Sequence, residues 1–149
     1  RNILALHRSL SQESTLIESE SRYIWMLTQL IQRYAEVRIT PRQIGQESTA
    51  IQKARRYIED RFAQDTSLNV LAQHVNLSPY YLLRCFCREI GMPPHTYLES
   101  VRVGHAPRLI RTGLPLAQVA LNVGFSSQSH MTRSFKKIIG VTPGQYAHS

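Results

Sequence analysis

The feature that most constrains the fold is an internal repeat in the second half of the chain. Four apolar residues return in the same order 48 residues later, the pairs being Leu68 with Leu116, Leu71 with Val119, Ala72 with Ala120 and Val75 with Val123. After a turn the offset becomes 49, and the further pairs are Arg84 with Arg133, Phe86 with Phe135, Gly91 with Gly140, Pro94 with Pro143 and Tyr97 with Tyr146. So many matches are difficult to obtain by chance, and they predict two copies of one supersecondary unit.

Each copy has the pattern of two short helices joined by a tight turn. Apolar residues recur at spacings of three and four through both helices. In the last helix of the second copy these residues are Met131, Phe135 and Ile138 or Ile139. Gly124 stands at the turn, where a positive φ is needed, and Asn76 takes the same place in the first copy. This order predicts two helix-turn-helix units, at about 68–90 and about 116–139.

The second helix of the second copy has a polar and basic outer face. Ser126 or Ser127 can cap its first turn with a side-chain oxygen. The residues that lie away from the apolar stripe are Gln128, Ser129, Thr132, Arg133 and Lys136. Side chains of these types hydrogen-bond base edges and phosphates, so this helix is a candidate for insertion into a DNA groove. We expect His130 of the same helix to be partly buried instead of facing DNA.

The corresponding helix of the first copy should begin with Ser78 as its cap and Pro79 at its first position. Its apolar face is formed by Leu82, Cys85 and Phe86, and its outward candidates are Tyr80, Leu83, Arg84, Cys87 and Arg88. Because this face is less polar, it either contacts thymine methyl groups or mainly anchors the protein on DNA, while the other helix distinguishes between base sequences. The alternative for Tyr80 and Tyr81 is that their rings only pack.

These residues carry a family resemblance that covers about two thirds of the chain. The matching segments are YI at 57–58, LxxLA from Leu68, LSPYYLLRCF from Leu77, YLESVRVGHA from Tyr97 and GFSSQSHMTRSFKKIIGVTPGQY from Gly124. Together they resemble the DNA-binding domain of the AraC/XylS transcriptional regulators, here at residues 50–149. The resemblance implies an all-α fold in which a long connecting helix, at about 95–113, joins the two helix-turn-helix subdomains. It also implies that two recognition helices enter successive major grooves of promoter DNA.

Two sets of candidate DNA contacts follow. The candidates for base edges are Tyr80, Leu83, Arg84, Gln128, Ser129, Thr132 and Arg133. The candidates for the DNA backbone are Ser78, Tyr81, Arg88, Ser127, Lys136 and Lys137. The family resemblance further implies an activator that contacts RNA polymerase. It implies no cofactor in this chain, and a small-molecule effector would bind a sensor domain outside it.

The charge distribution agrees with a nucleic-acid partner. The net charge is +8, of which residues 50–149 carry +7, with twelve basic and five acidic side chains. The excess therefore lies on the repeated half, where a polyanion would bind. The alternative is a different class of function, namely a helical interaction module whose basic face binds an acidic protein.

No chemistry beyond binding is indicated. The sequence holds no nucleotide-binding fingerprint, nucleophile elbow or paired histidines at metal-binding spacing, so neither an enzyme nor a metal site is expected. Cys85 and Cys87 are two residues apart in one helix and point roughly 200° apart, which disfavours a disulfide between them. Reduced thiols and the lack of a membrane-spanning apolar run predict a cytoplasmic protein.

We expect residues 1–36 to form a separate helical segment. Its apolar positions follow a helical period and are candidates for homodimerisation, namely Ile17, Ile24, Leu27, Leu30, Ile31 and Tyr34. The alternative is that this stripe packs on the DNA-binding domain of its own chain. The segment resembles the last helices of the sensor domain in larger AraC-type regulators, and the chain does not begin with Met. We therefore expect a fragment of a longer protein, and the rival is a stand-alone regulator of the same fold.

Two local features complete the predictions. Residues 37–49 have the composition of a linker, and Thr49 with Gln52 fits a capping box that would start the next helix. Gly104 and Pro107 depart from the family pattern of the connecting helix. Since a proline inside a helix removes one backbone hydrogen bond and clashes with the preceding turn, we expect a bend between Val103 and Pro107.

Overall fold

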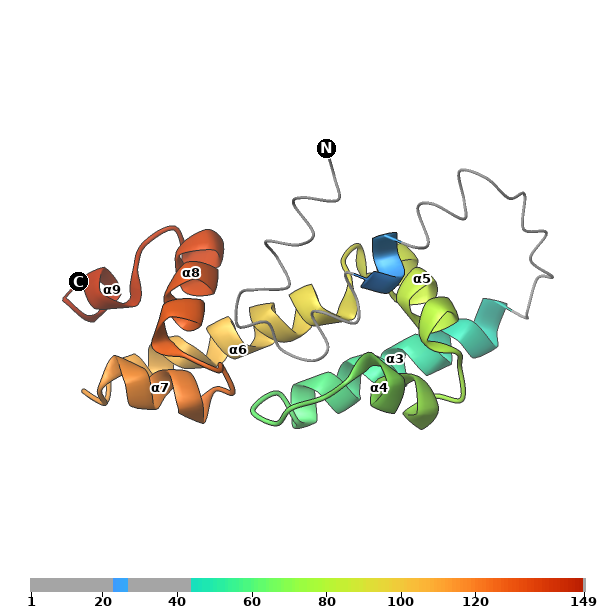
Figure 1. The fold of residues 1–149 in the computed structure, drawn as a ribbon, viewed down its shortest axis with the longest axis horizontal. Helices are drawn as coiled ribbons and strands as arrows, with labels where there is room; N and C mark the ends of the chain where they lie inside the picture. Colours follow the sequence, from blue (N-terminus) through green and yellow to red (C-terminus); the bar gives the residue numbers. More distant parts are fainter. Residues whose placement is uncertain (1–22, 27–43, 149) are drawn as a thin grey trace. The chain divides into compact units, whose positions relative to one another are not determined.

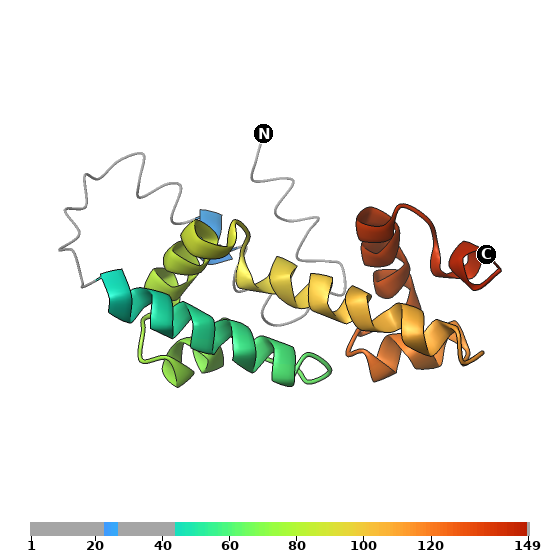
Figure 2. The ribbon, with the colours of Figure 1, turned by 180° about the vertical axis from the view of Figure 1, so that it is seen from behind.

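The computed structural model describes residues 23–26 and 44–148, with the side chain of Ile44 excepted. All regular structure in this described part is helical, which confirms the predicted fold class. Residues 23–26 form one helical turn. The helices that follow are α3 (Ile44–Asp60), α4 (Leu68–His74), α5 (Pro79–Ile90), α6 (Pro94–Ile110), α7 (Leu116–Asn122), α8 (Gln128–Ile139) and α9 (Pro143–Ala147). Figure 1 and Figure 2 show these helices from opposite sides.

The contacts divide the chain into two units, each with its own core. In the first, α4 and α5 form a helix-turn-helix that packs against α3, as both views show (Figure 1, Figure 2). Its fully or almost fully buried side chains include Ile51, Ala54, Ile58, Leu68, Leu71, Ala72, Leu82, Leu83 and Phe86. The helix α3 therefore shares one packed core with the first helix-turn-helix.

The second unit contains residues 98–149 and the turn at 61–65. Its core is built by the second part of α6 with α7 and α8, and its buried residues are Val103, Ala106, Ile110, Val119, Ala120, Val123, Phe125, Met131 and Phe135. Arg102 is also buried, with 1% of its surface exposed. Its guanidinium donates to the carbonyl oxygens of Phe62 at 2.7 Å and Gln64 at 3.1 Å, which ties the 61–65 turn to this core.

The helix α3 begins earlier than predicted. It starts at Ile44, so residues 44–49 are helical and do not belong to a linker. The Thr49 hydroxyl donates to the carbonyl oxygen of Gly45 at 3.0 Å, one turn back in the same helix. The predicted capping box at Thr49 and Gln52 is therefore wrong. The stretch is predicted as a linker because it is polar, but its Glu47 is buried at the start of the helix.

The predicted bend in the connecting helix is wrong as well. The helix α6 runs as one uninterrupted helix from Pro94 to Ile110, with Pro107 inside it. Val103 and Ala106, which lie in the stretch where the bend was expected, have no exposed surface. Their burial in the continuous helix offsets the cost of the backbone hydrogen bond that Pro107 cannot donate.

The predicted dimerisation stripe lies almost wholly outside the described residues. Only Ile24 falls within them, in the helical turn at 23–26, and it is half-buried.

Candidate nucleic-acid interface

The turn before α8 requires glycine at position 124 for two reasons. The φ angle of Gly124 is +88°, a conformation that residues with a side chain rarely adopt. A Cβ atom at this position would also lie 2.8 Å from the Cα atom of Ala63 in the 61–65 turn. The predicted positive φ is confirmed here, and at Asn76 of the first copy it is +55°. Each turn therefore contains one residue in the left-handed conformation.

The helix α8 exposes its polar side. Ser127 caps it by accepting a hydrogen bond from the His130 amide, and Met131 and Phe135 have no exposed surface. Exposed side chains follow from the first residue to the last turn, with Thr132 half-buried among them: Gln128, Ser129, Arg133, Lys136 and Lys137. The structure thus places the predicted polar and basic residues of this helix at the surface.

The predicted apolar stripe of α8 ends one turn early. Ile138 and Ile139 are 44% and 41% exposed, so the expectation that either one continues the buried stripe is wrong. The ring of Tyr146 in α9 lies edge-on to Phe135, with the centroids 5.7 Å apart. This contact closes the core at Phe135, and the last turn of α8 extends beyond it.

His130 is buried, as predicted, with 6% of its surface exposed. Its Nε2 atom lies 3.2 Å from Oε1 of Glu99 in α6, and its Nδ1 atom lies 3.5 Å from the Ser126 hydroxyl. The carboxylate can only accept, so Nε2 carries a proton, and in the neutral ring Nδ1 accepts from Ser126. The ring also contacts Phe125 edge-on, with the centroids 5.1 Å apart. His130 therefore connects α8 to α6.

The helix α5 begins at the predicted residues, and a glycine ends it. Ser78 accepts a hydrogen bond from the Tyr81 amide, and Pro79 is the first helical residue. Gly91 ends the helix with a φ of +84°. The caps show that local sequence alone determines the limits of this helix.

The orientation of α5 differs from the prediction at one base-contact candidate. Leu83 is 1% exposed and lies in the core with Leu82, Cys85 and Phe86, so the expectation that it faces outward is wrong. The reason is that α5 packs against both α3 and α4, which buries a wider face than one apolar stripe. Tyr80 and Arg84 are half-buried.

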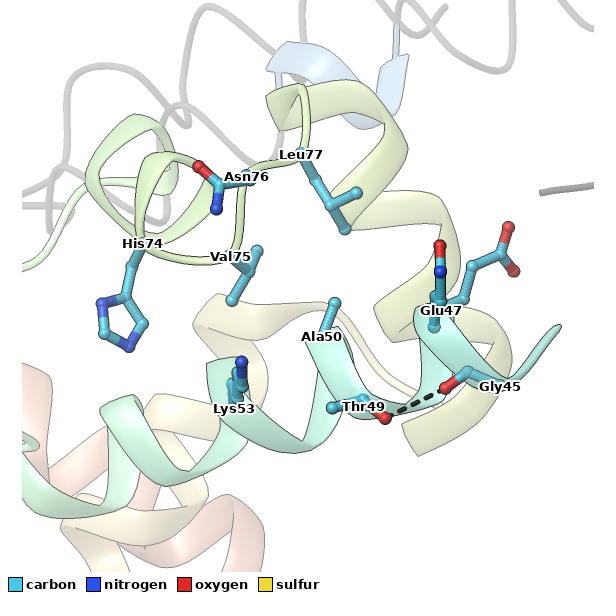
Figure 3. Close-up of a pocket in the computed structure, with 10 residues that line it drawn as sticks. Gly45, Glu47, Thr49, Ala50, Lys53, His74, Val75, Asn76 and Leu77 are labelled. Atoms are coloured by element: carbon cyan, nitrogen blue, oxygen red, sulfur yellow. Dashed lines mark hydrogen bonds between the residues drawn. The ribbon is translucent and has the colours of Figure 1, made fainter. Parts of the chain in front are cut away.

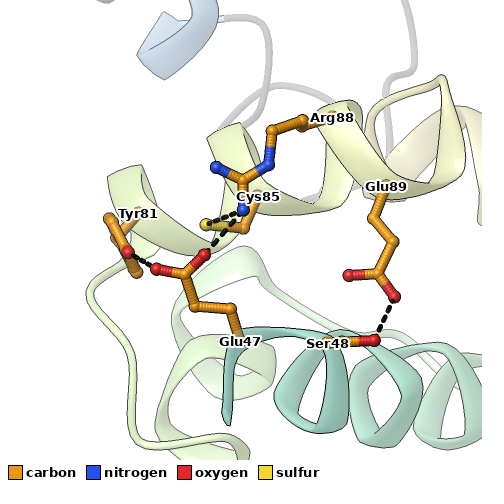
Figure 4. A network of polar contacts seen from close by, with 6 residues as sticks. All are labelled: Glu47, Ser48, Tyr81, Cys85, Arg88 and Glu89. Carbon is orange, nitrogen blue, oxygen red and sulfur yellow. Dashed lines mark hydrogen bonds and ion pairs between the residues drawn. The ribbon is translucent and has the colours of Figure 1, made fainter. Parts of the chain in front are cut away.

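Two backbone candidates of α5 bind a carboxylate instead of standing free. The Tyr81 hydroxyl donates to Oε1 of Glu47 and the Arg88 guanidinium donates to Oε2 at 2.6 Å, as Figure 4 shows. Glu47 is 6% exposed, whereas 58% of the Arg88 side chain is exposed. The hydrogen bond to Glu47 raises the pKa of Tyr81 to about 12 and also raises the pKa of Arg88. Sequence reasoning missed Glu47 because it stood in the presumed linker.

The cysteines are free thiols. Cys85 is buried, as predicted for a small apolar residue beside Phe86, and Cys87 is half-buried. Burial raises the pKa of both thiols, which favours the unreactive protonated form.

A groove of about 420 Å³ lies in the first unit, between α3 and the turn after α4 (Figure 3). Ala50, Val75 and Leu77 are among its lining residues, and so are Lys53 and His74. The Glu47 carboxylate points away from it in Figure 3, toward its partners on α5. No sequence pattern had indicated this groove.

Comparison with known proteins identifies the family. The family described as "Helix-turn-helix domain" matches residues 71–149. The chain belongs to the AraC/XylS family of helix-turn-helix proteins. This membership confirms the resemblance carried by the repeat and by the segment from Gly124 to Tyr146.

Two curated relatives are described as regulators. The chain is 33% identical over 126 residues to the uncharacterized HTH-type transcriptional regulator YbfI of Bacillus subtilis, covering 85% of this chain and 46% of the relative. It is 35% identical over 99 residues to the arabinose operon regulatory protein of Escherichia coli, covering 64% of this chain and 34% of that protein. The chain therefore spans less than half the length of either relative.

Solved structures share the fold. The C-terminal domain of AraT, a response regulator from Geobacillus stearothermophilus, is 33% identical to this chain, with a TM-score of 0.62. The match covers 74% of this chain and 87% of the AraT domain's chain. The DNA-binding domain of AdpA, solved in complex with a target DNA, is 23% identical with a TM-score of 0.62, covering 66% of this chain and 90% of that one. Within the described residues no helix is long and apolar enough to cross a membrane.

Proposed function

We propose that this chain is the DNA-binding part of a sequence-specific transcriptional regulator, acting as an activator. The observation that carries the proposal is the row of exposed polar and basic side chains on α8, behind a turn that only glycine fits. Such a surface suits the edges of base pairs and the flanking phosphates. The AdpA domain, which shares the fold, was solved on a target DNA, and this supports the same use of the fold here.

The proposal assigns roles by side-chain chemistry. The helices α5 and α8 enter successive major grooves, with base contacts from Tyr80, Arg84, Gln128, Ser129, Thr132 and Arg133. Ser78, Ser127, Lys136 and Lys137 contact phosphates. Arg133 is exposed and can give guanine two hydrogen bonds, so it is the strongest candidate for base discrimination. Tyr81 and Arg88 are bound to Glu47, which weakens their candidacy as backbone contacts.

The decisive experiment measures binding to DNA from the regulator's own upstream region and to a scrambled duplex, across a salt series. Arg133→Ala should reduce the preference for the specific duplex by about 1–3 kcal/mol. Lys136→Ala should weaken binding to both duplexes alike and lower the salt slope by about one. Lys53→Ala, on α3 in the other unit, is the matched control and should change neither quantity.

The second class of function is tested by the same data. A basic interaction module for an acidic protein would bind every duplex weakly and equally, and Arg133→Ala would leave that binding unchanged. This result would overturn the proposed function.

The regulator's partners extend the proposal. We infer a cytoplasmic homodimer joined through residues 17–34 that contacts RNA polymerase, with a small-molecule effector bound by a sensor domain. The apolar period of that segment supports dimerisation, and the descriptions of the relatives as transcriptional and operon regulators support the cytoplasmic setting.

A further inference from the structure

The internal repeat extends further than the helix-turn-helix units. In α3 the buried residues Glu47, Ile51, Ala54 and Ile58 follow one another at spacings of four, three and four. In α6 the same spacings, 52 residues later, give Glu99, Val103, Ala106 and Ile110. The three apolar residues of this second set are buried, and Glu99 is half-buried. Each helix-turn-helix is thus preceded by a supporting helix that opens its buried face with a glutamate.

Both glutamates bind the same position of the recognition helix. Tyr81 is the third residue of α5 and donates to Glu47 (Figure 4). His130 is the third residue of α8, and its Nε2 atom lies 3.2 Å from Glu99. Tyr81 and His130 correspond to each other at the repeat's offset of 49. The amino acid has changed from tyrosine to histidine between the copies, but the bond to a carboxylate is present in both.

Because these carboxylates are buried, their bonds can fix the rotation of each recognition helix about its own axis. The side chains of Glu47 and Glu99 are 7% and 17% exposed, so a rotation that broke either bond would leave a carboxylate poorly solvated. A helical residue turns by about 100° relative to its neighbour, so holding the third residue determines which side chains of the same helix face outward. On α8 those outward side chains include Ser129 and Arg133.

We propose that Glu47 and Glu99 are equivalent positioning residues, each of which holds one recognition helix at the rotation that presents its DNA-reading side chains. The consequence for DNA rests on the proposed function, whereas the effect on the helices does not. The two anchors differ in one respect, because Glu47 also holds Arg88 near the end of α5 at 2.6 Å. Glu47 therefore restrains α5 at two points about two helical turns apart, and Glu99 restrains α8 near its start.

The first test is amide hydrogen exchange on the full chain, compared between helices of the same molecule. Glu47→Ala should increase exchange in α5 about tenfold while α4 and α8 keep their rates, and Glu99→Ala should do the same for α8 alone. Tyr81→Phe, which removes only the hydroxyl, should change α5 in the same direction. Glu47→Gln, which keeps an acceptor for Tyr81, should restore part of the protection.

Glu59→Ala is the matched control, because Glu59 lies on α3 and also accepts from a tyrosine, Tyr97, which belongs to α6. It should leave exchange in α5 unchanged relative to α4. Equal acceleration of α4 and α5 in Glu47→Ala would show a merely structural role and would overturn the proposal. Unchanged exchange in α5 would overturn it too.

The second test uses a duplex enriched from a randomised pool by the unmodified chain. Glu47→Ala and Glu99→Ala should each lower the preference for this duplex over a scrambled one about tenfold, with affinity for the scrambled duplex retained. Loss of affinity for both duplexes alike would contradict positioning. If no duplex is enriched, the proposed function fails, and the exchange measurements still decide whether the glutamates anchor the helices.

Discussion

At the scale of single residues, Arg102 and Gly124 of the second unit depend on contacts that exist only in the folded chain. Arg102 is buried in the core of this unit, and burial lowers its pKa. It is stabilised there by two carbonyl oxygens and by the Phe125 ring, whose centroid lies 5.8 Å from the guanidinium carbon. Gly124 lies against the same 61–65 turn that these carbonyl groups come from. The turn is therefore held by Arg102 at Phe62 and Gln64 and lies close to Gly124 at Ala63.

Gly124→Ala adds a methyl group 2.8 Å from Ala63 at a φ of +88°, so it should destabilise the second unit by several kcal/mol, about 1 of them from the φ angle alone. Gly113→Ala is the control, since its φ is +78° and nothing lies within 4 Å of the added carbon. Urea unfolding of both variants gives the comparison. Equal losses of stability would mean that the contact with Ala63 contributes nothing.

At the scale of elements, polar bonds between helices determine how α3 supports α5. Tyr81 and Arg88 share Glu47, and the Glu89 carboxylate accepts from Ser48 at 3.0 Å and Gln52 at 3.1 Å. Figure 4 shows how Glu47 and Ser48 of α3 reach Tyr81, Arg88 and Glu89 of α5. They add direction to hydrophobic packing, which by itself is not directional.

The Tyr81 bond predicts a dependence of stability on pH. Its hydrogen bond to Glu47 raises the pKa of Tyr81 to about 12, above the ordinary value of 10.0. Because the folded pKa is the higher one, the stabilisation is complete below pH 10 and is lost as the pH rises from about 10 to about 12. The free energy of unfolding should fall over this window, and less steeply in Tyr81→Phe. Tyr97, whose pKa burial also raises to about 12, should contribute to the fall in both proteins. An unchanged slope in Tyr81→Phe would contradict the role of the bond.

At the scale of the whole molecule, the basic excess and the apolar N-terminal stripe lie in different parts of the chain. Residues 50–149 carry a net charge of +7, and residues 1–49 carry +1. This separation is what a DNA-binding part attached to a dimerisation segment requires, because each surface can then bind its own partner.

The dimerisation proposal is tested by Leu27→Asp and Leu30→Asp together. A charge at these apolar positions should convert a dimer to a monomer in analytical ultracentrifugation, since a carboxylate is costly to bury in an apolar contact. Gln29→Asp, between them in the sequence, is the control and should remain dimeric. A monomer in the unmodified chain would contradict the proposal. In a dimer, two linked recognition surfaces should also bind a repeated DNA site more tightly than a single one.

The sequence by itself determined the helical class, the repeat, the turns and the helix caps. Ser78, Pro79, Gly91 and Gly124 have their roles because backbone angles and cap bonds depend on residues a few positions apart. The outward face of α8 was predictable for the same reason, since the helical period separates it from the buried stripe.

Only the tertiary structure decided which polar residues are buried and where the apolar stripes end. Leu83 is buried because α5 meets two helices, and the stripe of α8 stops at Phe135 because Tyr146 lies against it. Glu47 and Tyr81 are 34 residues apart in the chain, and Glu99 and His130 are 31 apart. The sequence between them holds no local signal for either bond. Burial, hydrogen bonding and the continuity of α6 through Pro107 depend on contacts between distant segments, and these form only when the chain folds.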